Sequence, residues 1–293
     1  MINTIINVDK DSGITSTGVD KNIKKIIGTK KIGHVGTLDP LATGILPIFI
    51  GQATRLINFM NDRTKEYLCD LELGFTSTTF DTEGEVTKVP YKLTVSNDLL
   101  ESVVSTFIGE TLQVPPIYSS VKVNGHRAYS LARKGIQFNL EAKRIYIEDV
   151  TIIKNNMPTI SLSIKCNEGV YIRSLVHDIG EKLKCGAVLT KLRRTKSGIF
   201  DLNTATTLEH LSTDNWKDHT IPIDHIIKHL PRINTNENER YKLSTGQAIT
   251  KRISDNEFDD QSFVRCYDYE NMFIGIAQFE KNNNLFLPHK IFI

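Results

Sequence analysis

The chain has 293 residues, 40% of them hydrophobic, and a formal net charge of +2 at pH 7. This length and apolar content predict a large buried core, with one big domain and one small one. The near-neutral charge excludes a protein that binds nucleic acid simply as a polycation. No apolar run approaches the ~20 residues that a membrane span requires.

The four cysteines are far apart in the chain and include no C-x-x-C pair or Cys/His cluster. This spacing indicates single thiols in a reducing compartment, and it predicts no metal site. The N-terminus also lacks the basic and apolar regions of a signal peptide. We therefore expect a cytoplasmic protein that makes no contact with membranes. The cysteines are Cys69, Cys166, Cys185 and Cys266.

Hydrophobic periodicity predicts helices and strands in mixed order. In chain order, the pattern first predicts a helix capped by Thr15 or Ser16 that runs to Ile27, and then a strand over 67–73. A second helix is predicted over 96–108, and it should bury Leu99, Leu100, Val103, Val104 and Phe107. A strand over 160–166 and a helix from Arg173 or Ser174 to Gly186 follow. The irregular alternation favours an α+β fold over a doubly wound parallel sheet. No dinucleotide-binding or P-loop motif is present, so we expect no nucleotide cofactor.

The composition turns polar at residues 231–240, which predicts a linker there. Short apolar runs follow at 264–267, 273–279 and 285–292, and they are typical of a small β-rich unit. We therefore divide the chain into a main domain at 1–230 and a small module at 231–293.

One carboxylate stands out, in residues 33–44, which read GHVGTLDPLATG. The following proline disfavours a helical backbone at Asp39, so this residue should be extended. Gly36 and Gly44 allow backbone angles that other residues avoid. Leu-Asp-Pro alone would most simply be a turn. In this rigid, apolar setting, however, the carboxylate is suited to act as a nucleophile or a general base.

Together with residues 45–55, ILPIFIGQATR, this segment resembles the catalytic loop of the TruB family of bacterial tRNA pseudouridine synthases. The resemblance continues to about residue 200. It implies that Asp39 is the nucleophile and that His34 shapes the substrate pocket. A lone histidine is more often structural than catalytic, so we do not assign His34 as the base.

A second motif, GVYIRSL, covers residues 169–175. Arg173 lies at a predicted helix start, where the helix dipole disfavours a cation unless an anion is nearby. The resemblance implies that Tyr171 and Arg173 belong to the active site and that Arg173 pairs with Asp39. Such a pair would keep the Asp39 carboxylate ionised.

The resemblance assigns further residues to the substrate and to RNA. It implies that Tyr67 stacks on the target uracil, as aromatic rings do with flipped bases, and that Leu192 lines the pocket. Basic residues in the matching motifs are expected to contact RNA; these are Lys10, Arg55, Lys122 and Arg127.

For the whole chain, the resemblance implies a pseudouridine-synthase fold with a mainly antiparallel sheet flanked by helices, an RNA-contacting insertion at about 120–145, and a PUA-like RNA-binding module at 231–293. The implied activity is isomerisation of uridine 55 in the T loop of elongator tRNAs. It implies no cofactor, no metal and no guide RNA. We expect a monomer whose partner is the tRNA T arm.

Two departures from the family pattern affect residues near the site. Lys10 is followed by Asp11 where the family has proline, and the first aspartate of T-D-T-x-D-x-x-G is Thr78 here, while Asp81 is kept. Two alternatives remain open. One is a non-catalytic tRNA-binding protein or folding chaperone with the same fold, and the other is a relative that works on guide RNA within a larger particle.

Overall fold

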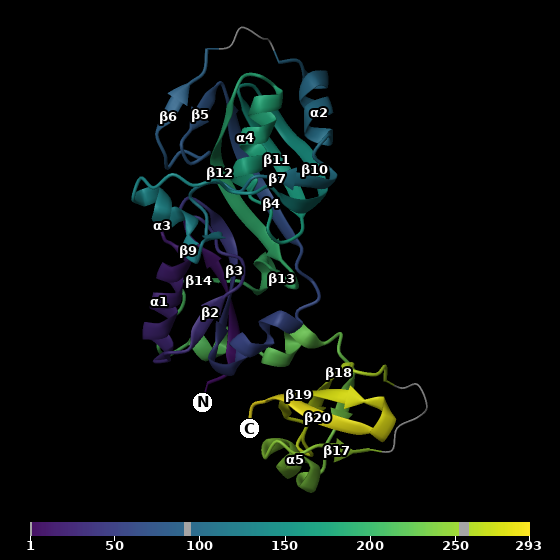
Figure 1. Cartoon of the computed structure of the whole chain (residues 1–293). Helices are drawn as coiled ribbons and strands as arrows, with labels where there is room; N and C mark the ends of the chain where they lie inside the picture. The colour runs from purple at the N-terminus through teal and green to yellow at the C-terminus, as the bar shows by residue number, and fades with distance from the viewer. Residues whose placement is uncertain (1, 91–94, 252–257) are drawn as a thin grey trace.

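One long, mainly antiparallel sheet organises the first 230 residues (Figure 1). The computed structural model describes residues 2–90, 95–251 and 258–293. Within them the strand order is β14-β1-β3-β12-β4-β11-β10-β7, with β13 on β12, β15 on β1 and β2 on β3. The strands are β1 (Thr4–Lys10), β2 (Ile32–His34), β3 (Thr43–Ile50), β4 (Lys65–Leu73), β7 (Gly109–Gln113), β10 (Lys143–Asn156), β11 (Thr159–Cys166), β12 (Ala187–Ser197), β13 (Phe200–Asp201), β14 (Thr206–Thr207) and β15 (Thr220–Ile221).

Helices flank this sheet, as the predicted α+β class requires. Helix α4 packs against β12, and α2 packs against β10. The α-helices are α1 (Ser16–Ile27), α2 (Asn97–Ser105), α3 (Ala128–Arg133), α4 (Ile172–Lys182) and α5 (Glu237–Ser244). The 3-10 helices are η1 (Gly51–Phe59), η2 (Leu202–Thr204), η3 (Trp216–His219), η4 (Ile223–Ile227) and η5 (Lys281–Asn283).

Most local predictions agree with these elements. Thr15 caps α1 through its side chain, and Gly28 ends the helix in the left-handed conformation. The prediction for Leu99 was wrong, because its side chain is 37% exposed. Helix α2 ends at Ser105, before the predicted 108, and its apolar stripe starts one residue later, at Leu100. The stripe then follows helical spacing and buries Val103, Val104 and Phe107.

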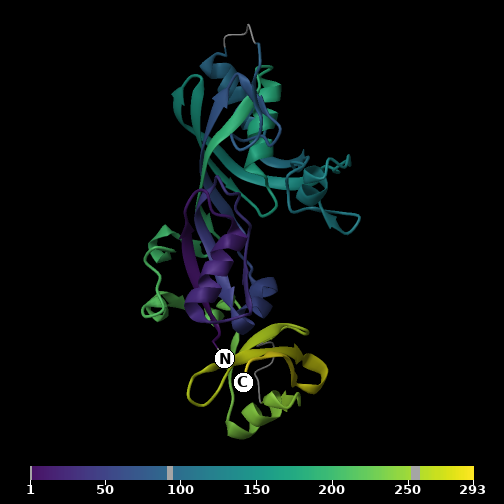
Figure 2. The same cartoon turned by 90° about the vertical axis from the view of Figure 1, so that its left-hand side faces the viewer.

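Two small sheets extend from the main one. Strands β5 (Phe75–Ser77) and β6 (Val86–Lys88) form a hairpin, as do β8 (Lys122–Val123) and β9 (His126–Arg127). Figure 2 shows the segment that contains α3 projecting sideways from the body of the sheet. Helix α3 and the β8–β9 hairpin lie within residues 120–145.

The C-terminal residues form a second sheet with its own core. Its strand order is β16-β18-β19-β20-β17, and only the β16–β18 pair is parallel. The core contains Val264, Ile274 and Phe286. The strands are β16 (Arg232–Asn234), β17 (Ile249–Thr250), β18 (Phe263–Tyr267), β19 (Phe273–Glu280) and β20 (Leu285–Ile291).

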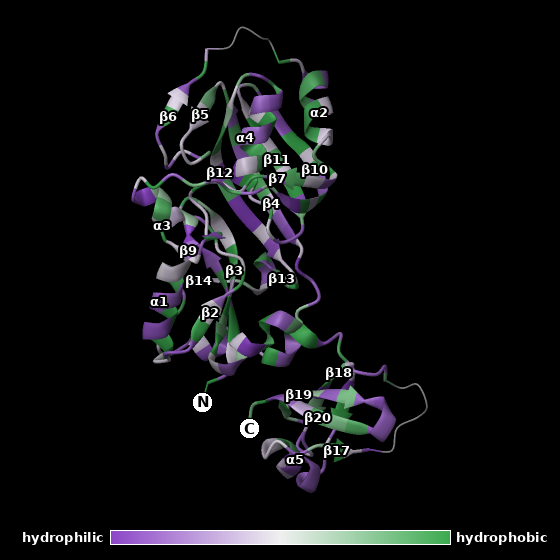
Figure 3. Ribbon diagram, in the orientation of Figure 1, coloured by the Kyte–Doolittle hydropathy of each residue, from purple (hydrophilic) through white to green (hydrophobic). Residues whose placement is uncertain are grey.

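The predicted linker at 231–240 was wrong. Strand β16 pairs with β18, and α5 begins at Glu237 with a capping box between Asn236 and Glu239. The polar side chains there accept hydrogen bonds from backbone amides at the start of a helix instead of forming an unstructured connection. Figure 3 shows how hydrophilic α5 is beside the apolar strands of this sheet.

The two sheets meet through an apolar cluster. Phe49 and Ile276 belong to the same buried group, and the ring of Phe59 contacts those of Phe263 and His289 edge-on, with centroids 5.0 and 5.6 Å away. This contact lies at the end of the main sheet near which both termini are found (Figure 1).

A parallel pairing of β3 with β12 brings Gly44 against the backbone of Arg194. A Cβ at Gly44 would lie 2.1 Å from the Arg194 carbonyl oxygen, and φ at this glycine is +102°. Both facts require glycine, as the sequence predicted.

Replacing Gly44 with alanine should therefore destabilise the fold by about 3 kcal/mol, because overpacking adds to an unfavourable φ. Urea denaturation measures the free energy of unfolding. Gly28→Ala is the matched control, since φ there is +71° and no atom lies within 4 Å of the added Cβ. The control should lose about 1 kcal/mol, and an equal loss in both variants would contradict the packing argument.

Candidate active site

The main sheet carries a cavity of about 820 Å³, lined by segments from residue 15 to residue 194. Its volume is within the range of small-ligand sites. The walls come from the loop at residues 35–42, from β4 and β12, from the β5–β6 connection, and from the start of α4. We call residues 35–42 the Asp39 loop.

Backbone contacts hold the Asp39 loop from both sides of Asp39. The Ser16 hydroxyl donates to the Leu38 carbonyl at 2.9 Å and accepts from the Leu38 amide at 2.8 Å. The amide of Gly13 donates to the Pro40 carbonyl at 2.8 Å. The first residue of α1 and the chain just before it therefore fix the backbone on both sides of the Asp39 carboxylate.

Lys10 supports the same loop, and the prediction that it contacts RNA was wrong. Its side chain is fully buried, and Nζ donates to the carbonyls of Asp11, Ile14 and Pro40 at 2.8, 2.7 and 3.3 Å. Burial lowers the pKa of Lys10 to about 8, although the nearby Asp39 carboxylate opposes the shift. The ammonium cannot reach a phosphate from this position.

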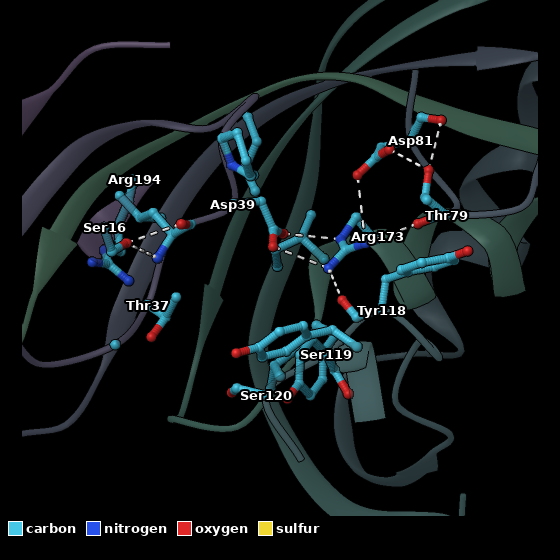
Figure 4. Close-up of a pocket in the computed structure, with 18 of the residues that line it drawn as sticks. Ser16, Thr37, Asp39, Thr79, Asp81, Tyr118, Ser119, Ser120, Arg173 and Arg194 are labelled. Carbon is cyan, nitrogen blue, oxygen red and sulfur yellow. Dashed lines mark hydrogen bonds and ion pairs between the residues drawn. The ribbon is translucent and has the colours of Figure 1, made fainter. Parts of the chain in front are cut away.

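Arg173 lies directly against Asp39 (Figure 4). Its Nη2 donates to Oδ1 at 3.0 Å, and its Nε lies 2.9 Å from Oδ2, so both carboxylate oxygens face the guanidinium. The Arg173 side chain is 5% exposed, whereas that of Asp39 is 34% exposed and open to the cavity. This arrangement orients the carboxylate and leaves it accessible to a ligand.

Arg173 also holds three groups that the sequence analysis did not assign. Its Nη1 donates to the Thr79 carbonyl at 3.0 Å and lies 3.5 Å from a carboxylate oxygen of Asp81, and its Nη2 donates to the Tyr118 carbonyl at 3.0 Å. The retained aspartate of the motif at 77–84 was the available signal for Asp81. A guanidinium between two carboxylates explains why a cation is stable at the start of α4.

The pKa of Asp39 is raised above its ordinary value, mainly by burial. The Arg173 guanidinium opposes the rise, and the Asp81 carboxylate adds to it. The sequence analysis considered only the arginine, which favours the carboxylate, and could not include the loss of water around it. Because its pKa is raised, the Asp39 carboxylate takes up a proton at a higher pH than an exposed aspartate does when the solution is acidified.

Tyr67, Tyr171 and Leu192 line the cavity with Asp39. Tyr67 is 8% exposed and Leu192 is 7% exposed, and both lie on adjacent strands of the sheet. Burial raises the pKa of Tyr67, so its hydroxyl stays protonated. Tyr171 precedes α4, and its backbone exchanges two hydrogen bonds with the Gln113 side chain, at 2.9 and 3.1 Å.

His34 does not line the cavity itself. Its Nδ1 lies 2.9 Å from Asp20 Oδ2 and its Nε2 lies 3.0 Å from the Thr37 hydroxyl. Thr37 is part of the cavity wall. The histidine therefore connects Asp20 of α1 to Thr37 of the Asp39 loop without lining the cavity.

The remaining predicted RNA contacts do not line the cavity themselves. Lys122 and Arg127 are exposed and face each other across the β8–β9 hairpin. Arg55 lies between the two sheets, where Nη1 donates to the Ile291 carbonyl at 3.3 Å and the guanidinium covers the ring of Phe292. Arg55 therefore joins the two sheets in this structure.

Residues 2–90, 95–251 and 258–293 contain no group of three or more His, Cys, Asp or Glu side chains that could hold a metal ion. None of the helices in these ranges is long and apolar enough to cross a membrane. All four cysteines are buried and free.

Comparison with known proteins identifies the chain. The family model described as TruB family pseudouridylate synthase (N terminal domain) matches residues 24–172. The model described as tRNA pseudouridylate synthase B C-terminal domain matches 173–233, and that described as Pseudouridine synthase II TruB, C-terminal, matches 231–286.

Curated relatives match over nearly their whole length. The tRNA pseudouridine synthase B of Clostridium novyi is 41% identical over 277 residues, which cover 94% of this chain and 95% of the relative. That of Clostridioides difficile is 39% identical over 291 residues, or 97% and 96% of the two chains. That of Clostridium tetani is 38% identical over 278 residues, or 94% and 96%.

Solved structures share the fold at lower identity. A Cbf5-Nop10-Gar1 complex matches with a TM-score of 0.69 at 24% identity, covering 99% of this chain and 85% of the other. An H/ACA RNP bound to a substrate RNA containing 2'-deoxyuridine matches with the same TM-score and coverage at 22% identity. At this identity the likeness concerns the fold.

The fold and the family models therefore define a pseudouridine synthase, which is an isomerase. The chain belongs to the TruB family. The predicted family, fold class and enzyme class are confirmed.

Replacing Arg173 with glutamine should raise the pKa of Asp39 further, because the guanidinium that favours the carboxylate is lost while Asp81 stays. Carbon-13 NMR titration of the aspartate carboxyls measures this pKa, and Asp39→Asn assigns the resonance. Arg193→Gln is the control, since Arg193 pairs with Asp9 at 2.7 Å. An unchanged or lower Asp39 pKa in Arg173→Gln would contradict the role of the pair.

Proposed function

We propose that the protein converts uridine 55 in the T loop of elongator tRNAs to pseudouridine, with Asp39 as the nucleophile. The observation that carries the proposal is the Asp39–Arg173 pair, in which an oriented carboxylate opens to a cavity. The relatives named tRNA pseudouridine synthase B support tRNA as the substrate. The choice of uridine 55 rests on the family resemblance of the motifs at 33–55 and 169–175.

The reaction requires the target base to leave its stack and enter the cavity. Extrusion costs roughly a few kcal/mol, which stacking within the pocket offsets. In this proposal Tyr67 stacks on the uracil and Leu192 forms an apolar wall. Both residues line the cavity with Asp39, which supports these roles.

Pseudouridine formation breaks the bond between uracil N1 and ribose C1′, turns the base, and joins C1′ to C5. Substrate and product have the same atoms, so the reaction balances without an added redox carrier. Asp39 acts by attacking the ribose or the base, or by assisting loss of a ribose proton. Tyr171, at the start of α4, is positioned to handle a proton late in the reaction or to pack against the nucleotide.

Binding of the T arm would involve the projecting segment and the C-terminal module. Lys122 and Arg127 are exposed on the β8–β9 hairpin, where they suit phosphate contacts. We assign residues 1–230 to catalysis and the PUA-like module at 231–293 to further RNA contacts. The identity to bacterial relatives favours a stand-alone, monomeric, cytoplasmic enzyme over a guide-RNA particle.

Asp39→Asn should lower product formation by at least about 1,000-fold, because the amide cannot serve as nucleophile or base. Binding of unmodified tRNA should stay close to wild type. Tritium release from tRNA labelled at uridine C5 measures turnover, and mapping of pseudouridine identifies the position modified.

Asp70→Asn is the control, since Asp70 pairs with exposed Lys191 away from the cavity. It should keep wild-type turnover. Appreciable turnover by Asp39→Asn would refute the nucleophile, and pseudouridine at another position would refute uridine 55.

Lys122→Ala should weaken binding of every tRNA to a similar extent and reduce the slope of log affinity against log salt by about 1, as loss of one phosphate contact does. Filter binding at several salt concentrations measures both quantities. Lys165→Ala, which removes a β11 lysine paired with Glu148, is the control. An unchanged slope would exclude a phosphate contact at Lys122.

A further inference from the structure

Two buried cations lie side by side in the cavity wall. Lys65 on β4 is 4% exposed and Arg194 on β12 is 1% exposed, and both line the cavity. Arg194 is the cross-strand partner of Tyr67, and Lys65 is two residues from Tyr67 on the same strand. Because side chains alternate along a strand, Lys65 and Tyr67 share one face of β4.

Both cations have fewer protein acceptors than buried cations normally have. Lys65 Nζ donates to the Ser197 hydroxyl at 2.6 Å, and Arg194 Nε donates to the Ile45 carbonyl at 2.7 Å. The Arg194 side chain also hydrogen-bonds to the Tyr67 hydroxyl. The buried Nη2 of Arg194 has no hydrogen-bond partner. Among the residues with described positions, no carboxylate oxygen lies within 4.0 Å, the limit for an ion pair, of a charged nitrogen of Lys65 or Arg194.

The other buried cations at this site differ in that respect. Lys10 donates to three carbonyls, and Arg173 faces two carboxylates and two carbonyls. Buried charges in folded proteins are normally paired or saturated in this way. Lys65 and Arg194 therefore form a desolvated pair of like charges, which is costly unless an anion enters the cavity.

The charge on Lys65 is sensitive to pH. Burial lowers its pKa to about 8, and Arg194 lowers it as well. Glu168, Asp62 and Cys166 oppose the shift from neighbouring segments. The amine is thus charged at neutral pH and becomes neutral as pH rises past about 8.

We propose that Lys65 and Arg194 form an anion subsite that binds the carbonyl edge of the target uracil and stabilises the negative charge on the base once the C1′–N1 bond is broken. This inference rests on the proposed function. When that bond breaks, its electron pair stays on the base and spreads over N1, O2 and O4. Lys65 and Arg194 donate hydrogen bonds to this anion and keep their protons. The proton on C5 leaves after the C1′–C5 bond forms, and N1 takes up a proton.

A base fits this place better than a phosphate does. The cations adjoin the ring of Tyr67 and the apolar Leu192, which suit the two faces of a planar ring. A phosphate in so enclosed a position would lose its hydration, whereas the uracil anion forms there only after the base has entered. Hydrogen bonds to a charge that appears only during the reaction increase the rate of the chemical step more than they increase the affinity for the tRNA.

The decisive experiment replaces Lys65 with methionine in the full chain. At saturating unmodified tRNA, the single-turnover rate should fall by about 100-fold, as for loss of one donor to a developing anion. The dissociation constant for tRNA should change by no more than about threefold, because the charge arises after binding. Lys165→Met is the matched control and should keep the wild-type rate.

An unchanged rate would overturn the inference. So would weaker binding with an unchanged rate and a smaller salt slope, which would identify a phosphate contact instead. If wild-type protein itself makes no pseudouridine, the proposed function fails; if wild type and Lys65→Met are equally active, only the anion subsite fails.

Two further measurements separate catalysis from structure. The thermal unfolding midpoint of Lys65→Met should equal or exceed that of wild type, because removal of an unpaired buried charge relieves repulsion. A fall of several degrees would identify a structural cation and overturn the inference.

The second measurement is the pH dependence of kcat/KM, which reports groups in the free enzyme. The wild-type value should decline as pH rises past about 8, where Lys65 becomes neutral. In Lys65→Arg the decline should move to higher pH, since arginine stays charged. An identical alkaline limb in both proteins would contradict a role for the Lys65 charge.

Discussion

The ion pair between Asp39 and Arg173 joins parts of the chain that are 134 residues apart. Its guanidinium also contacts the 79–81 turn and the carbonyl of Tyr118, so one side chain gathers four segments around the cavity. Without that cation, the carboxylates of Asp39 and Asp81 would face each other in a site with little water. The geometry of the cavity therefore depends on a charge at the start of α4.

Charge in the cavity is divided between two regions. On one side, Arg173 and Lys10 hold the Asp39 loop, and their donors are used by protein acceptors. On the other side, Lys65 and Arg194 keep donors that the protein leaves largely unused. A nucleotide between them would meet an oriented anion near the sugar and cations near the base, which suits a reaction that separates charge across the glycosidic bond.

The sequence predicted the family, the fold class and the pairing of Asp39 with Arg173, because these depend on local motifs and on periodicity. It did not predict contacts that depend on how deeply a side chain is buried in the folded protein. Lys10 was expected to contact RNA but is fully buried, and the position of Arg55 between the sheets follows from docking of the second sheet. The polar run at 231–240 was misread because a capping box and a linker have similar compositions. The raised pKa of Asp39 depends on desolvation, which no motif encodes.

The parallel pairing of β3 with β12, which presses Gly44 onto Arg194, has a consequence for protein synthesis. Residues 43 and 44 find their partners only when residues 193 and 194 have been made. During translation, some 150 further residues must therefore be made before β12 can pack against the segment that follows the Asp39 loop. A nascent chain still on the ribosome therefore holds no finished pocket until β12 has emerged, because residues of β12 line it.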